Sequence, residues 1–114
     1  MNKISLVAVA RDQLDRARRT SSGRSARSVY GGHEHALRQT VLALSAGTTL
    51  AEHDSPGEAT LQVLIGRVRL RAGDAHWDGR DGDLIMIPLD RHELHALEDA
   101  AVLLTTVTPI APGS

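Results

Sequence analysis

Two stretches of the sequence decide the fold: residues 47–66, GTTLAEHDSPGEATLQVLIG, and residues 82–92, GDLIMIPLDRH. Each contains a short aliphatic run, at 61–65 and at 84–87, that is closed by glycine or proline. Runs of this length, bounded by residues that turn the chain, predict β-strands rather than helices. The two stretches therefore indicate a fold built from short strands.

The same pattern continues on both sides of these stretches. Arg67, Arg69 and Arg71 alternate with Val68 and Leu70, which predicts an inward aliphatic face and a solvated outer face of arginines. Since no helical segment separates the strands, we expect them to form an antiparallel sandwich or barrel. The seven predicted strands are 38–44, 61–65, 67–71, 75–77, 84–87, 93–97 and 102–107.

The N-terminal part of the chain has a different pattern. Residues 4–18 carry apolar side chains at helical spacing, which predicts a short amphipathic helix with Ser5 as its N-cap. Residues 19–28 are small, polar or basic and predict a mobile linker. We therefore divide the chain into residues 1–29, a helix with its linker, and residues 30–114, the strand-rich barrel.

Composition excludes several classes of protein. The chain has 114 residues, which suits one domain, and a net charge of −1 with 2% aromatic residues, which argues against a nucleic-acid partner. It has no cysteine, and its apolar runs are far shorter than the ~20 residues of a membrane-spanning helix. The N-terminus lacks the pattern of a signal peptide. We expect a cytoplasmic protein without a membrane partner.

The two opening stretches resemble the paired motifs of the cupin superfamily, G-x5-H-x-H-x3–4-E-x6-G and G-x5-P-x-G-x2-H-x3-N. Gly47, His53 and Gly66 keep the frame of the first motif, and Gly82 and Pro88 keep that of the second. The resemblance implies an all-β, single-domain cupin double-stranded β-helix, an RmlC-like jelly-roll barrel with a short N-terminal α-helix outside it. It is similar to small bacterial cupins of unassigned function, and it implies a homodimer.

The departures from those motifs bear on the site. The resemblance implies metal ligands at His53 and His92, but Ser55 stands where the family has its second histidine, and Glu58 is one position from the family's glutamate. Two histidines alone would hold Zn, Ni, Mn or Fe weakly. We expect His53, Ser55, Glu58, Gln62 and His92 to line the ligand cavity, with His53 and His92 as the metal ligands.

The other histidines are weaker candidates. If they lie on a strand, His33 and His35 share a face, as a surface or interface pair at the entry to the first barrel strand. His95 is three residues from His92 and is predicted to face the opposite, exposed side. His76 is predicted to be a surface residue, and Trp77 a packing anchor near the barrel rim. The sequence contains neither G-x-S-x-G nor H-E-x-x-H.

Besides a purely structural or protein-interaction role, two functions remain open at this point. The first is binding of a small molecule, with or without a divalent metal, in the barrel cavity and with no assigned reaction. The alternative is a metal-dependent cupin enzyme of the dioxygenase or isomerase type with a degenerate ligand set.

Overall fold

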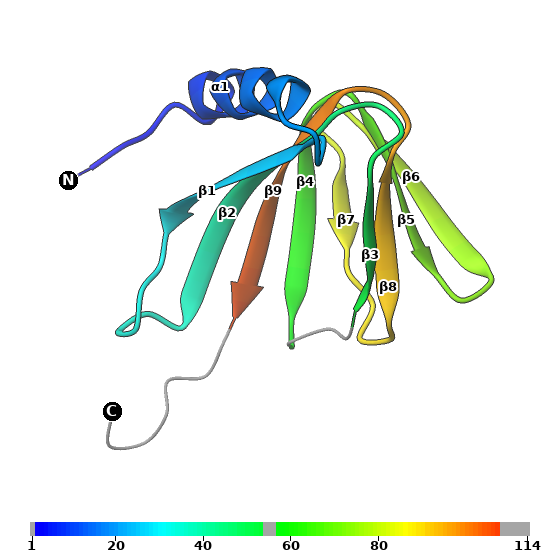
Figure 1. The fold of residues 1–114 in the computed structure, drawn as a ribbon. Coiled ribbons are helices and arrows are strands. Elements are labelled where there is room, and N and C mark those ends of the chain that lie inside the picture. The colour runs from blue at the N-terminus through cyan, green and yellow to red at the C-terminus, as the bar shows by residue number, and fades with distance from the viewer. Residues whose placement is uncertain (1, 54–56, 108–114) are drawn as a thin grey trace.

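The computed structural model of the protein describes residues 2–53 and 57–107. Within these residues one helix, α1 (Leu6–Arg19), precedes nine strands, as Figure 1 shows. None of the described helical residues forms a segment long and apolar enough to cross a membrane. The strands are β1 (Arg24–Tyr30), β2 (Leu37–Leu44), β3 (Thr49–His53), β4 (Ala59–Ile65), β5 (Arg67–Ala72), β6 (Ala75–Arg80), β7 (Leu84–Met86), β8 (His92–Ala96) and β9 (Ala100–Val107).

The strands form two antiparallel sheets. One sheet has five strands in the order β1-β2-β9-β4-β7, and the other has four in the order β3-β8-β5-β6. The two sheets face each other across the interior of the barrel (Figure 1). The predicted all-β jelly-roll class with a short N-terminal helix is therefore confirmed.

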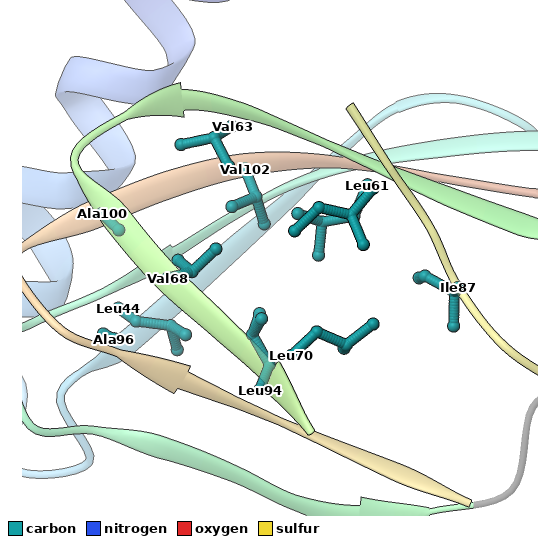
Figure 2. Close-up of a cluster of buried hydrophobic side chains, with 11 residues drawn as sticks. Leu44, Leu61, Val63, Val68, Leu70, Ile87, Leu94, Ala96, Ala100 and Val102 are labelled. Atoms are coloured by element: carbon teal, nitrogen blue, oxygen red, sulfur yellow. The ribbon is translucent and has the colours of Figure 1, made fainter. Parts of the chain in front are cut away.

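The core between the sheets is aliphatic. Figure 2 shows Leu61 and Val102 of the five-stranded sheet directed toward Leu70 and Leu94 of the four-stranded sheet. The alternation of β5 is confirmed, because Val68 and Leu70 are buried while Arg67, Arg69 and Arg71, which alternate with them, face outward. The buried members of this cluster are Leu44, Leu61, Val63, Val68, Leu70, Ile85, Ile87, Leu94, Ala96, Ala100 and Val102.

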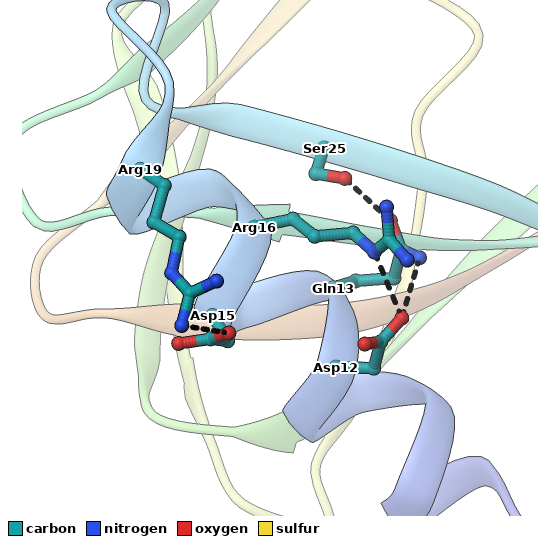
Figure 3. A network of polar contacts seen from close by, with 6 residues as sticks. All are labelled: Asp12, Gln13, Asp15, Arg16, Arg19 and Ser25. Carbon is teal, nitrogen blue, oxygen red and sulfur yellow. Dashed lines mark hydrogen bonds and ion pairs between the residues drawn. The ribbon is translucent and has the colours of Figure 1, made fainter.

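Helix α1 covers one end of the outer face of the five-stranded sheet. Ser5 caps it as predicted, because its Oγ accepts a hydrogen bond of 3.2 Å from the Ala8 amide. The buried stripe of the helix packs on small and aliphatic residues of the sheet, and this cluster contains Val9, Ala10, Leu14, Ala17, Val41, Ala43, Ala101 and Leu103. Figure 3 shows the polar side of the helix, where Asp12 pairs with Arg16 at 3.0 Å.

The prediction of a mobile linker at residues 19–28 is wrong. The second half of that segment, residues 24–28, belongs to β1, an edge strand that pairs with β2 from Arg24↔Leu44 onward. The strand buries little apolar surface, so its hydrogen bonds to β2 hold it in place. Ser25 also donates to the Gln13 side chain of α1 (Figure 3). The boundary drawn between residues 29 and 30 consequently falls inside β1.

Two further differences concern β3 and β6. The local sequence pattern predicts no strand at β3, which links the turn after β2 to the His53 region. Trp77 is not a packing anchor: 44% of its surface is exposed, since β6 is an edge strand on which Gly79 is the buried residue. A Cβ added at Gly79 by an alanine substitution would lie 3.0 Å from Ile85 Cδ1. The close packing at this position therefore favours glycine over a residue with a side chain.

Candidate functional site

A small cavity lies in the barrel interior, between the two sheets. Its volume is about 40 Å³, and among the described residues that line it His92 is polar and the others are aliphatic. The strands supply this lining because both sheets direct aliphatic side chains, mostly leucines at this level of the barrel, toward the interior. The lining residues are Leu42, Leu50, Leu61, Leu70, Ile87, His92, Leu94 and Leu104.

The strand β8 directs His92 into the barrel. Its residues alternate between buried and half-buried, so His92 lies on the same face as Leu94 and Ala96. His92 is 4% exposed, and its Nδ1 lies 3.0 Å from the Asp90 carbonyl oxygen. A carbonyl can only accept, so Nδ1 carries the proton in this bond. In the neutral ring Nε2 is then the nitrogen with the lone pair.

The backbone register relates His92 to the first motif. His53 is the Cα partner of His92 in the pairing of β3 with β8, after an irregularity that follows Leu50. The two sequence motifs therefore meet on neighbouring strands. The side chain of His53 and the whole of Ser55 lie outside the described part of the structure.

Two other predicted cavity residues lie elsewhere. Gln62 is between Leu61 and Val63, which face the core, so the alternation of β4 places Gln62 on the outer face instead. Its cross-strand neighbour there is Leu103, which belongs to the cluster under α1. Glu58 is exposed just before β4 begins. Neither residue is among those that line the cavity.

These placements limit the metal chemistry of the described residues. No group of three histidine, cysteine, aspartate or glutamate side chains that could hold a metal occurs among residues 2–51 and 57–107. Within that part of the chain, His92 is the one predicted ligand that lines the barrel cavity. The described residues therefore do not form a complete metal centre by themselves.

His33 and His35 are on the turn that joins β1 to β2, not on a strand. The His35 ring lies 4.9 Å from the Tyr30 ring, centroid to centroid, and its Nε2 is 3.6 Å from Glu34 Oε1. The strand geometry that would place both imidazoles on one face is therefore absent from this described turn. His35 interacts with its immediate neighbours at the end of the β1–β2 hairpin.

His95 faces the outer side of β8, as predicted, but it is half-buried rather than exposed. Its Nδ1 lies 2.9 Å from Thr49 Oγ1 and its Nε2 lies 2.9 Å from Glu93 Oε1. Sequence reasoning missed this chain of contacts, although the H-E-L-H spacing places Glu93 and His95 on one face. The contacts tie β3 to β8 on the outside of the barrel, just beyond the cavity wall.

The arginine face of β5 is partly neutralised. Arg69 Nε donates to Asp78 Oδ1 at 2.7 Å and Arg69 Nη2 donates to Asp78 Oδ2 at 2.9 Å. The hydrogen bond and the positive charge of Arg69 lower the pKa of Asp78 below its usual value. Arg67 is 4.0 Å from Glu98. At Arg67 and Arg69, therefore, the outer face of β5 is a solvated surface on which each arginine pairs with a carboxylate.

The sequence matches no protein-family model and no curated protein. Its structure is similar to that of a conserved protein of unknown function from Streptococcus pyogenes, with a TM-score of 0.70, 27% identity, and coverage of 81% of this chain and 80% of that one. It is also similar to an RmlC-like cupin protein from Desulfovibrio desulfuricans, with a TM-score of 0.64, 24% identity, and coverage of 74% and 81%.

A third similar structure is a salicylate 1,2-dioxygenase from Pseudaminobacter salicylatoxidans. Its TM-score is 0.74 at 17% identity, over 88% of this chain and 33% of the dioxygenase. This chain therefore spans about a third of that enzyme. The agreement with the cupin structures is an agreement of fold.

Proposed function

We propose that this chain, which has the cupin fold, binds a small and largely apolar molecule in its barrel interior, with His92 as the polar anchor. The observation that carries the proposal is the part of the cavity lining that the structure describes, in which the His92 imidazole lies among aliphatic side chains. Ligand sites commonly combine an apolar wall with a few polar groups that fix the orientation of the ligand. His92 supplies such a group, and its bond to the Asp90 carbonyl oxygen fixes the ring.

The volume of the cavity limits the size of the ligand. One water needs roughly 10–15 Å³ of such space, so a cavity of about 40 Å³ accommodates a molecule of a few non-hydrogen atoms. Leu42, Leu50 and Leu104 are half-buried at the wall. A change in their rotamers would enlarge the cavity at its exposed end, so a larger ligand would enter there.

The test uses 2-propanol, which has a small apolar body and one hydroxyl group. We expect its addition to shift the methyl NMR signals of Leu61 and Leu94 in the wild-type protein. The variant His92→Leu keeps an apolar side chain but loses the hydrogen-bonding ring, and we expect its dissociation constant to rise about fivefold. Gln62→Leu, on the outer face, is the matched control and should leave the constant unchanged. Equal affinity in His92→Leu and the wild type would contradict the proposal.

A second proposal is that His53 joins His92 in a weak site for a divalent metal. It is supported by the backbone register, because antiparallel Cα partners commonly share a face of a sheet. A metal held there would act as a Lewis acid toward an oxygen ligand. Since the described residues supply one ligand in the cavity, we assign no catalytic step, and binding is favoured over a dioxygenase- or isomerase-type activity.

Thermal unfolding in the presence of Ni²⁺ tests the metal proposal. A metal that binds the folded state and not the unfolded state stabilises the folded state by RT ln(1 + [L]/Kd). This free energy is about 2.7 kcal/mol when the metal concentration is a hundredfold above Kd. We expect His53→Ala to abolish the rise in melting temperature. The control His33→Ala, at the distant β1–β2 turn, should retain it. A rise that persists in His53→Ala and disappears in His33→Ala would assign the metal to the turn.

A further inference from the structure

A second hollow lies outside the barrel, on the face of the five-stranded sheet that carries α1. Figure 1 shows that the helix covers one end of this face and that the N-terminal segment leaves the helix above β1 and β2. The hollow has a volume of about 780 Å³, which is within the roughly 300–1,000 Å³ of ordinary small-molecule sites. We call this hollow the N-terminal groove.

The walls of the N-terminal groove are mainly apolar. Ile4 and Leu6 line it from the N-terminal segment and the start of α1, and Val29, Tyr30 and Leu103 line it from the sheet. Ile4 is 44% exposed and Tyr30 is 46% exposed, so this apolar surface is open to solvent. Covering it with an apolar group would remove that surface from water, which favours binding.

The charged residues of the groove all have the same sign. Lys3 comes from the N-terminal segment and Arg27 from β1, and the described residues that line the groove include no carboxylate. Within the described residues neither side chain forms an ion pair, although the chain as a whole has a net charge of −1. The groove therefore combines an apolar wall with two cations that lack an acidic partner there.

We propose that the N-terminal groove binds an amphipathic organic carboxylate. Its hydrocarbon body would pack on Ile4, Leu6 and Leu103, and its carboxylate would lie between Lys3 and Arg27. Guanidinium and ammonium groups form charge-assisted hydrogen bonds with carboxylates, and those bonds are stronger than neutral ones. Gln39 also lines the groove, but its Nε2 donates to Thr105 Oγ1 at 3.2 Å.

A second copy of the chain is a poorer occupant than a small carboxylate. A twofold interface places the same surface of both copies together, so Lys3 and Arg27 of each copy would approach those of the other. Like charges placed together across an interface disfavour association. This site is separate from the barrel cavity, and the proposal does not depend on the function proposed above.

The experiment is a titration of the full chain with octanoate, followed by calorimetry and by amide NMR. We expect octanoate to bind more tightly than 1-octanol and to shift the amide signals of Val29 and Leu103. Arg27→Gln should weaken octanoate binding about fivefold, and adding Lys3→Gln should weaken it further. Arg24→Gln, on the same strand but outside the groove, is the control and should leave the affinity unchanged.

Three outcomes would overturn this proposal. The first is equal affinity for octanoate and 1-octanol, which would remove the role of the two cations. The second is loss of octanoate binding in His92→Leu but not in Arg27→Gln, which would place the ligand in the barrel. The third is a dimer in sedimentation analysis that Arg27→Gln abolishes, which would identify a second copy as the occupant.

Discussion

Replacing Gly66 by alanine should be among the most damaging small changes in this protein. Gly66 joins β4 to β5 with φ +87°, in the left-handed region that costs an L-residue roughly 1–2 kcal/mol. An added Cβ would overlap the Asp99 carbonyl oxygen and lie 3.0 Å from Ala100 Cα. Both atoms belong to backbone that leads into β9, so the chain must move. Overpacking of this kind costs roughly 1–3 kcal/mol.

The two contributions sum to roughly 2–5 kcal/mol, and for a domain of this size the melting temperature should fall by roughly 8–20 °C. The control is Gly82→Ala, because Gly82 has φ +88° but nothing within 4 Å of the added Cβ. Its loss should be the backbone cost alone, roughly 1–2 kcal/mol. Urea unfolding of both variants measures the difference. Equal losses would refute the argument that Asp99 excludes a side chain at Gly66.

The remaining predictions concern the core and the acid stability. Leu70→Ala, in the middle of the barrel, should lower the free energy of unfolding by about 2–5 kcal/mol, whereas Arg69→Ala, on the outer face, should lower it far less because solvent screens its ion pair; similar losses in urea would show that the strand faces are misassigned. Hydrogen bonds from the Ala46 amide and the Arg18 guanidinium hold the pKa of Asp99 below its usual value. A lowered pKa stabilises the folded state above the ordinary carboxyl pKa of about 4, and the effect is lost as the pH falls through the lowered value. Asp99→Asn should therefore be less stable than the wild type by about 1 kcal/mol at pH 7 and equal to it in acid, and a difference that persists in acid would argue against this linkage.

Two kinds of strand were predicted most accurately from the sequence: those in which apolar and polar residues alternate, and those that run through the core. The strand predicted at 67–71 spans Arg67–Ala72 in the structure, and the strand predicted at 38–44 spans Leu37–Leu44. Their side chains are aliphatic where the barrel needs filling, so the pattern alone indicates both the strand and its inner face. β1 could not be found in this way, because its hydrogen bonds to β2 stabilise it rather than apolar burial.

The candidate site was predicted only in part, because the sequence pattern indicates local alternation but not the contacts between distant strands. The alternation of side chains along β8 is a local property, so the sequence pattern was enough to predict that His92 and His95 lie on opposite faces. Gln62 was predicted to line the cavity, whereas its neighbours Leu61 and Val63 occupy the inward positions of β4. The contact of His95 with Thr49 joins residues 46 positions apart, and such a contact depends on the register of β3 with β8. The homodimer remains a prediction.

The most direct test of the central claim is a crystal structure of the protein soaked in 2-propanol. We expect an ordered alcohol between Leu61 and Leu94, with its hydroxyl within hydrogen-bonding distance of His92. The same soak of His92→Leu should show the alcohol in the cavity at lower occupancy, in line with its weaker binding. An alcohol that binds elsewhere, while the barrel interior holds only packed side chains, would contradict the claim that this cavity is the binding site.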